Sequence, residues 1–217
     1  MTMIKIKTLQ LGPVMTNAYL VADEATKEAT VIDPAWDGER ILKEAEKENW
    51  QIKQIWVTHA HFDHIGGVSA IVNGLPEPPI VALHPKDRAL WKAKGGAPLF
   101  GMRFESSAKP NMELYHGQVL KLGDNSSVVR HAPGHTRGHV MFYFEDAGVL
   151  FSGDVIFQGS VGRTDLPGGD WDTLLNSIRT QVLSLPDEVR IFSGHGPETT
   201  VGQERRTNPF LNEGPWY

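Results

Sequence analysis

Hydrophobic and polar positions along the chain follow two periods, one typical of strands and one typical of helices. Residues 3–8 alternate apolar and polar side chains with a period of two, as a half-buried strand does. Residues 37–50 place Ile41 and Ala45 on one face of a helix that we expect Asp37 to cap. The same analysis predicts strands over 17–23, 29–34, 52–58, 78–84, 119–124, 126–136, 139–146, 148–157 and 188–197, and helices over 65–74, 85–96, 171–186 and 198–206.

Strands and helices alternate in both halves of the chain, which favours two packed sheets with helices outside. Residues 95–118 are the least periodic part and are expected to form a loop or lid. Of 217 residues, 40% are hydrophobic and 22% are charged, which excludes a disordered chain, a collagen-like chain and a coiled coil.

Charge and cysteine content narrow the chemistry further. The net charge is −5 and basic residues form no long run, so we expect no nucleic-acid partner. Cysteine is absent, so any metal must be held by nitrogen and oxygen ligands. The N-terminal residues contain no clean apolar core, and every longer apolar stretch is interrupted, so we expect neither a signal peptide nor a transmembrane helix. These features predict a cytoplasmic protein that binds no membrane.

Candidate ligands are densest directly after a predicted buried strand. Residues 58–64 read THAHFDH, with four nitrogen or oxygen ligands. In an extended segment, alternate residues share a face, so His59, His61 and Asp63 are expected to converge. His64 is then expected to point elsewhere. Imidazole and carboxylate suit zinc, iron, manganese, nickel or cobalt, and such a cluster can serve two adjacent ions.

Three later segments repeat one arrangement, in which a ligand-type side chain follows a β-rich run beside glycine. These residues are His135 in APGHT, Asp154 in SGD and His195 in SGHG. Glycine lets the backbone approach a metal closely. A carboxylate between apolar runs, such as Asp154, needs a partner if it is buried. Together with residues 58–64, the three segments predict a metal centre.

The motifs THAHFDH, APGHT, SGD and SGHG resemble those of the metallo-β-lactamase-fold hydrolases over nearly the whole chain. The resemblance implies an α/β (α+β) fold, a four-layer αββα sandwich with a metal site at one edge of the two sheets. It also implies two divalent metal ions, with zinc the first expectation and iron or manganese the alternatives. By motif, His59, His61 and His135 would bind the first ion, Asp63, His64 and His195 the second, and Asp154 would bridge them.

Within that family, the chain most resembles the short bacterial glyoxalase-II-like branch, the relatives of hydroxyacylglutathione hydrolase. The segments GSVGRTDLPGGDWDTLLNSI and RRTNPFL are similar to that branch. The chain ends soon after His195, so we expect residues 1–217 to form a single metallo-β-lactamase-fold domain without the C-terminal helical glutathione-binding domain. A Gly-Arg-Thr-Asp stretch also replaces the lysine-bearing glutathione segment, which leaves the thiol carrier open.

The implied enzyme is a binuclear metallohydrolase, a thioesterase that cleaves small S-acylglutathione-type thioesters such as S-D-lactoylglutathione with a metal-bound hydroxide. Asp63 would bind a metal and orient the hydroxide, which makes it the expected catalytic residue. One alternative is a persulfide dioxygenase with a single iron held by His59, His135 and Asp154. Another is a different ester or lactone hydrolase of this fold. A β-lactamase is less favoured because many use a cysteine ligand. A closed structural zinc site would be four-coordinate, whereas seven candidate ligands leave open positions.

Other polar residues complete the predicted site. Asp33, Thr136 and His139 are candidates to orient metal-binding histidines, which usually donate their second N–H to a carboxylate or carbonyl. Arg163 and Asp165 are candidates to bind substrate or to pair with each other. The remaining candidates are Trp36 and Phe104 as pocket walls, and His84, His116 and His131 as histidines with a structural role only.

Overall fold

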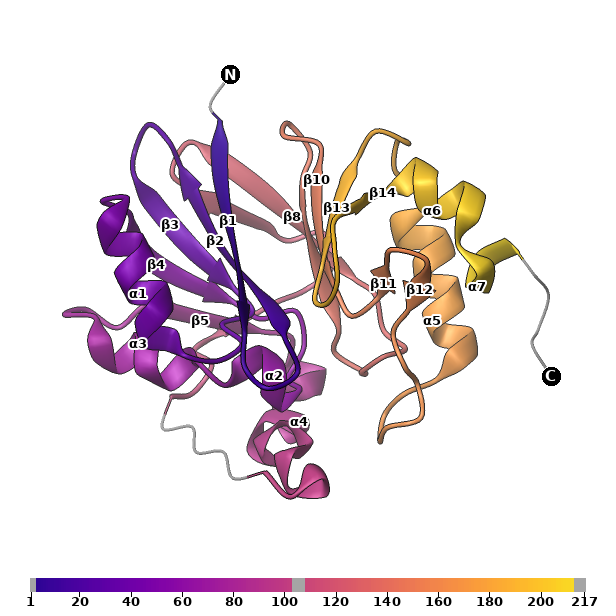
Figure 1. Cartoon of the computed structure of the whole chain (residues 1–217), viewed down its shortest axis with the longest axis horizontal. Helices are drawn as coiled ribbons and strands as arrows, with labels where there is room; N and C mark the ends of the chain where they lie inside the picture. The colour runs from indigo at the N-terminus through magenta and orange to yellow at the C-terminus, as the bar shows by residue number, and fades with distance from the viewer. Residues whose placement is uncertain (1–2, 103–107, 213–217) are drawn as a thin grey trace.

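The computed structural model describes residues 3–102 and 108–212 and contains two six-stranded sheets (Figure 1). The first sheet has the order β1 (Ile4–Leu11), β2 (Thr16–Asp23), β3 (Glu28–Ile32), β4 (Gln51–Trp56), β5 (Ile80–Leu83) and β6 (Met112–Glu113). The second has the order β14 (Thr199–Thr200), β13 (Arg190–Ser193), β10 (Val149–Gly153), β9 (Val140–Phe144), β8 (Asn125–His131) and β7 (Val119–Leu122). A small hairpin of β11 (Ile156–Phe157) and β12 (Ser160–Val161) stands apart from both.

Helices lie on the outer sides of the two sheets (Figure 1). Those beside the first sheet are α1 (Gly38–Lys47), α2 (Phe62–Ile65), α3 (Val68–Gly74) and α4 (Arg88–Lys92), with 3-10 segments at Pro85–Asp87 and Lys94–Phe100. Those beside the second sheet are α5 (Trp171–Ser177), which continues as a π-helical stretch over Ile178–Val182, α6 (Val201–Thr207) and α7 (Pro209–Asn212). Within the described ranges, no helix has the length and apolar character needed to cross a membrane.

Three hydrophobic clusters separate four layers. The central cluster joins the two sheets, where the rings of Trp56 and Phe142 lie 5.3 Å apart. The other two clusters lie between each sheet and its helices. Successive residues of β2 point in opposite directions, so Tyr19 enters the central cluster while Leu20 enters an outer one. The αββα sandwich expected from the sequence is therefore confirmed.

Strand direction brings the ligand-bearing loops to one edge of the sandwich. β3, β4 and β5 are parallel to one another, and β10 is parallel to β13. Residues 59–64 follow β4, Asp154 follows β10 and His195 follows β13, while His135 lies between β8 and β9. Because parallel strands end at the same edge of their sheet, these loops meet there.

Some local predictions were wrong. Asp37 precedes α1, but its backbone is left-handed (φ 44°) and its side chain makes no capping hydrogen bond. The helix expected over residues 85–96 is divided into the 3-10 turn Pro85–Asp87 and the short helix α4, which ends at Lys92. Lys94 then adopts a positive φ, and so do Gly95 and Gly96 within the following 3-10 segment.

The region expected to be an irregular loop, residues 95–118, contains more regular structure than its sequence indicates. The 3-10 segment runs to Phe100, and β6 pairs with β5 at the edge of the first sheet. Phe104, one of the candidate pocket walls, lies outside the described residues.

Candidate metal centre

Three buried imidazoles face one another at the edge of the sandwich, and we call His59, His61 and His135 the first group. His135 Nε2 lies 2.9 Å from His61 Nδ1 and 3.2 Å from His59 Nε2. The ligand atoms of the three side chains all lie within 4.8 Å of one another. Ring nitrogens converge in this way where a proton or a cation can lie between them, so the arrangement fits a divalent ion with imidazole ligands.

Asp63, His64 and His195 form a second group beside the first. Asp63 Oδ2 lies 3.3 Å from His195 Nε2 and 3.4 Å from His64 Nε2. The His64 side chain is fully buried, but those of Asp63 and His195 are 13% and 31% exposed. The second group therefore lies on the solvent side of the first.

Asp154 lies between the two groups. Its carboxylate oxygens are 3.4 Å from His64 Nε2, 3.6 Å from His135 Nε2 and 3.7 Å from His195 Nε2. Asp154 Oδ1 and His64 Nε2, which face each other at 3.4 Å, are both buried and have no other hydrogen-bond partner among the described residues. Buried polar atoms normally have partners, so these two fit ligands of a cation. The structure thus brings all seven predicted ligands together, and their binding of metal stays a prediction.

The expectation that His59, His61 and Asp63 share one face was wrong. The chain is extended only as far as His61 (φ −67°, ψ 148°), and α2 begins at Phe62. The helical turn directs Asp63 and His64 together into the second group. One short segment therefore supplies ligand-type side chains to both groups.

Asp33 holds this segment in place through its carboxylate. Its carboxylate accepts hydrogen bonds from Thr58 N at 2.7 Å and Thr58 Oγ1 at 2.6 Å. It also lies 2.8 Å from His64 Nδ1. A proton on Nδ1 would be donated to Asp33, which is the orienting contact that metal-binding histidines usually have. Nε2 of His64 would then face Asp63 and Asp154.

The loops after β8 and β10 are also held by close contacts. His135 Nδ1 lies 2.7 Å from the backbone oxygen of Arg163. His139 Nε2 accepts a hydrogen bond from Asp154 N at 3.0 Å, and its ring stacks on His59 with 4.7 Å between centroids. A side chain at Gly162 would overlap the backbone oxygen of Asp154, so this close approach requires glycine.

The remaining predicted residues lie further from the ligand atoms. Thr136 Oγ1 donates to Asp87 Oδ2 at 2.8 Å, so its hydroxyl binds a carboxylate rather than a histidine ring. The Arg163 side chain pairs with Asp165 through two hydrogen bonds, and the two side chains are 53% and 66% exposed. Trp36 packs against the ring of Phe62, with 6.4 Å between centroids.

The sequence analysis did not identify several residues whose hydrogen bonds position the site. Thr16 Oγ1 donates to Asp63 Oδ2 at 3.0 Å. The Asn17 side chain donates to the backbone oxygens of Ser193 and Gly196, on either side of His195. Asp87 accepts hydrogen bonds from both histidine-bearing loops. Each contact joins residues far apart in the chain, and no spacing motif marks them.

The histidines interpreted as structural also lie together. His84 stacks on His131 with 4.3 Å between centroids and 7° between planes. His131 N donates to His116 Nδ1 at 3.2 Å, and His131 Nε2 lies 3.1 Å from the backbone oxygen of Arg137. Burial and the neighbouring His131 lower the pKa of His84 to about 4.

Electrostatics differ between the two groups. Burial lowers the pKa of His59 well below its usual value and that of His61 to about 3, so both imidazoles are neutral at pH 7. Burial acts to raise the pKa of Asp63, but the neighbouring His64 and His195 bring it down to about 2. Neutral imidazole and ionised carboxylate are the forms that bind metal.

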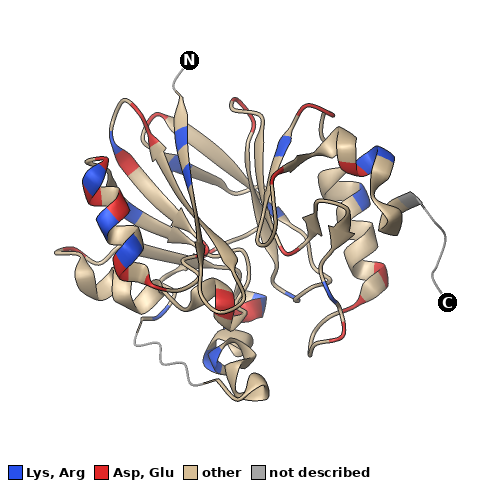
Figure 2. Ribbon diagram, viewed as in Figure 1, with Lys and Arg blue, Asp and Glu red and all other residues tan. Residues whose placement is uncertain are grey.

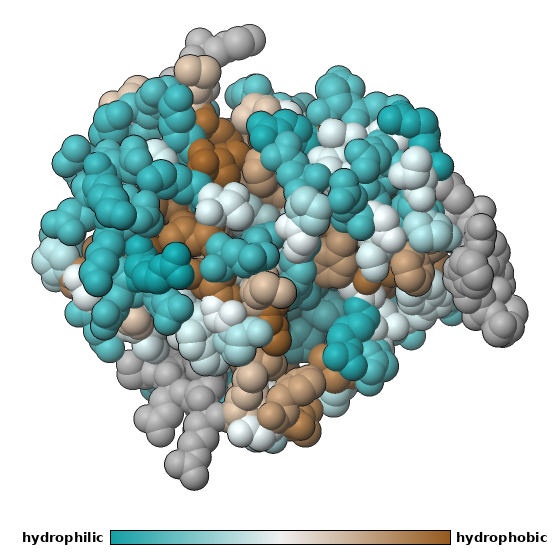
Figure 3. All heavy atoms as spheres, in the orientation of Figure 1, coloured by the Kyte–Doolittle hydropathy of each residue, from teal (hydrophilic) through white to brown (hydrophobic). Residues whose placement is uncertain are grey.

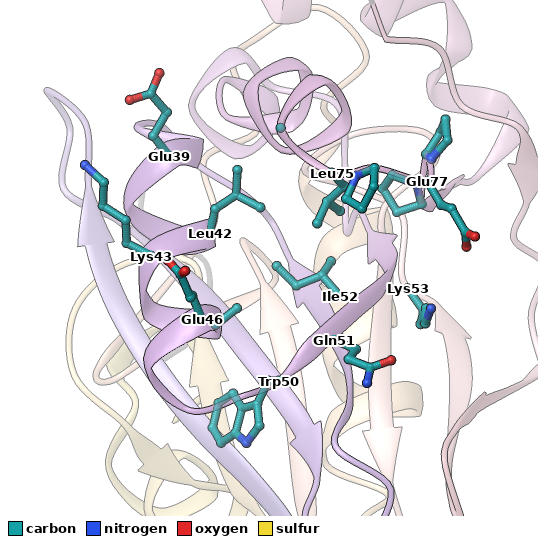
Figure 4. A pocket seen from close by; sticks show the side chains of 15 residues that line it. Glu39, Leu42, Lys43, Glu46, Trp50, Gln51, Ile52, Lys53, Leu75 and Glu77 are labelled. Carbon is teal, nitrogen blue, oxygen red and sulfur yellow. The ribbon is translucent and has the colours of Figure 1, made fainter.

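Other surface features lie away from this centre. A cavity of about 850 Å³ separates α1 from the Leu75–Pro79 loop, where Leu42, Ile52 and Leu75 point into the same space (Figure 4). Basic and acidic residues alternate along the ribbon of α1 (Figure 2). Hydrophobic residues appear at the lower margin of the view near α4 (Figure 3), where Leu99 is 69% exposed and Phe100 lies 5.5 Å from the ring of Phe62.

Comparison with known proteins identifies close relatives of this architecture. Residues 11–195 match the model of the metallo-beta-lactamase superfamily. Hydroxyacylglutathione hydrolase GloC of Haemophilus influenzae is 36% identical, with 96% of this chain and 99% of that protein covered. The crystal structure of the BLEG-1 B3 metallo-beta-lactamase is 42% identical and superposes with a TM-score of 0.89 over 96% of this chain and 100% of that one. TTHA1623 in a di-iron-bound form is 41% identical, with a TM-score of 0.86 over 94% of this chain and 100% of that one.

Proposed function

This chain belongs to the metallo-β-lactamase superfamily, and from that premise we propose that it is a metal-dependent thioesterase acting on small S-acylglutathione-type thioesters. The observation that carries the proposal is the pair of ligand groups with Asp154 between them. The similarity to a hydroxyacylglutathione hydrolase over nearly the full length of both proteins supports S-D-lactoylglutathione as the first substrate to test.

The proposed cofactors are two divalent ions, one in each group, with zinc tested first and iron second. Such ions supply a Lewis acid for the substrate carbonyl and lower the pKa of bound water. Their ligands fit, because imidazole nitrogens and carboxylate oxygens converge and two of these buried atoms lack other partners among the described residues.

The protein's own residues would prepare the site for attack on a carbonyl. Asp33 and Arg163 O hold the rings of His64 and His135 in one orientation. Thr16 holds one oxygen of Asp63, on the partly exposed side of the site. There the Asp63 carboxylate would accept a hydrogen bond from the attacking water and orient it. A thiol leaving group with a pKa of about 8.5 departs readily as thiolate, so the chain need not supply an acid.

The test is thiol release from S-D-lactoylglutathione by the zinc-loaded protein, with Asp154→Ala as the blank. We expect turnover that the substitution abolishes. Absence of thiol release from the zinc-loaded and the iron-loaded protein would exclude glutathione thioesters as substrates.

A second candidate function is hydrolysis of a β-lactam amide. The observation that favours it is the 42% identity to a protein described as a B3 metallo-beta-lactamase, which outweighs the argument from the missing cysteine. Nitrocefin turnover by the same preparation distinguishes the two. Turnover of nitrocefin without thiol release would replace the thioesterase proposal with this one.

A further inference from the structure

Asp87 is a buried carboxylate outside the two ligand groups. It ends the 3-10 turn Pro85–Asp87 that follows β5, and only 2% of its surface is exposed. Its Oδ2 accepts hydrogen bonds from Ala60 N at 3.1 Å and Thr136 Oγ1 at 2.8 Å, and its Oδ1 accepts one from Gly138 N at 2.6 Å. One side chain therefore receives three donors from two distant loops.

Those donors are next to the first group in the chain. Ala60 lies between His59 and His61, and Thr136 directly follows His135. Asp87 thus connects the two loops that provide all three imidazoles. The ring nitrogens of these imidazoles approach to 2.9 and 3.2 Å, so a small shift of either loop changes the space available to an ion.

We propose that Asp87 is a positioning residue that sets the spacing of the first group and thereby its affinity for a divalent ion. The inference rests on the metal centre of the proposed function. It extends the support of the site beyond Asp33, whose carboxylate binds Thr58 and His64.

The residues next to this carboxylate leave space for it and donate hydrogen bonds to it. A Cβ at Gly138 would lie 2.6 Å from Asp87 Oδ1, so a larger residue there would displace the hydrogen bond. Burial raises the pKa of Asp87, while the hydrogen bonds from Thr136 and the backbone act to lower it. Burying a carboxylate is unfavourable unless donors compensate it, and here the donors come from the metal loops.

Replacement by asparagine keeps the shape but changes the donor pattern. A carboxylate offers two acceptor oxygens, whereas an amide offers one oxygen and one NH₂ group. With backbone N–H groups facing both oxygens, either orientation of the amide places NH₂ against a donor. We expect one of the two loops to move away from Asp87→Asn.

Asp23 provides a matched control. It is fully buried and accepts hydrogen bonds from Ala25 N, Thr26 N, Asp124 N and the Asn125 side chain. These bonds join the β2–β3 turn to the β7–β8 turn, at the opposite end of β2 from Thr16. With about 3.3 Å per strand residue, this end of β2 is roughly 20 Å from the ligand groups.

The experiment measures metal binding by the full chain after treatment with a chelator. Zn²⁺ affinity is determined by chelator competition, Co²⁺ binding by its visible spectrum, and the stability of the metal-free protein by chemical denaturation. We expect Asp87→Asn to weaken the binding of an ion by the first group about 10- to 100-fold, the usual effect of losing a residue that orients metal ligands. Asp23→Asn should lose stability but change the affinity less than about twofold, because distant sites act independently.

If Asp87→Asn does not fold, Thr136→Val tests the role of Asp87 instead. It removes one donor to Asp87, and we expect a loss of about two- to tenfold in Zn²⁺ affinity, which corresponds to the net contribution of a typical hydrogen bond. Thr136→Ser retains the hydroxyl and should bind more tightly than the valine variant. If Asp87→Asn and Thr136→Val both bind Zn²⁺ with wild-type affinity, the inference about Asp87 is overturned, whereas the proposed function is not affected. A wild-type protein that binds no divalent ion would overturn the proposed function as well.

Discussion

The two ligand groups lie side by side but are built differently. His59, His61 and His135 are buried, and the lowered pKa values of His59 and His61 keep those rings neutral. The second group is partly exposed, and there the carboxylates raise the pKa of His64 and of His195, although burial opposes this. The difference indicates a division of roles. The first group is shaped by the protein interior, whereas the second meets solvent and substrate.

Their supports differ as well. The first group is held by Asp87 and by the backbone oxygen of Arg163. The second depends on the start of β2, where Thr16 contacts Asp63 and Asn17 binds the loop around His195. Substitutions in each support should therefore affect one ion more than the other.

The largest effect is expected from His61→Ala. Loss of a buried ligand should remove the first ion and lower thioesterase turnover by about 1,000-fold, since a bound ion contributes several kcal/mol to transition-state stabilisation. His195→Ala should retain one ion, because its side chain lies at the exposed edge. Elemental analysis and turnover measured together test this difference. Equal metal loss in both variants would mean that the two groups do not differ as described.

Asp63→Asn should act on turnover more than on substrate binding. Without a carboxylate to orient the attacking water, kcat should fall by about 100-fold, the range of general acid–base effects. KM should stay close to the wild-type value. Steady-state kinetics decide the matter, and unchanged kcat would remove Asp63 from the proposed catalytic role.

Asn17→Ala tests the support of the second group. It removes two hydrogen bonds to the loop that carries His195, and a cost of about 1.4 kcal/mol would correspond to a tenfold loss of activity. The first ion should be retained. Loss of the first ion from this variant would show that Asn17 supports both groups.

Stability should depend on pH through His84. The backbone oxygen of this residue accepts a hydrogen bond from Asp87 N, which links it to the support of the first group. Its pKa is about 4 when folded and about 6.5 when unfolded, with His131, Lys86 and Glu113 as neighbouring charged groups. The unfolded chain therefore binds the proton more readily between these values. At about 1.4 kcal/mol per pKa unit the full shift corresponds to about 3 kcal/mol, and solvent screening lowers this value. Stability should therefore be full above pH 6.5 and fall by about 1 to 2 kcal/mol as the pH drops toward 4. Denaturation of the metal-free protein should show a shallower fall for His84→Gln, and an identical fall would contradict this assignment.

The smallest effect is expected from Arg163→Ala. The pair with Asp165 is exposed, so stability should stay close to that of the wild type. A rise in KM for glutathione thioesters at unchanged metal content would give the side chain a role in substrate binding. Unchanged KM would restrict position 163 to its backbone contact with His135.

Local patterns indicated the strands, the helices and the ligand-type residues, whereas the four-layer arrangement was expected from the resemblance to a known family. The β-rich run over residues 17–23 indicated strand β2, and glycine-flanked residues such as Asp154 at strand ends indicated the site. The start of α2 at Phe62 was missed because THAHFDH fits an extended segment equally well. Asp87 was missed because its partners lie 27, 49 and 51 residues away, and only the folded chain brings them together.

The most direct measurement is thiol release from S-D-lactoylglutathione as Zn²⁺ is added back to chelator-treated protein. Activity should be absent at the start, rise with added metal and reach a plateau, while Asp154→Ala stays at background. Full activity in the chelator-treated protein, or equal activity in wild type and Asp154→Ala, would contradict metal-dependent catalysis at this site.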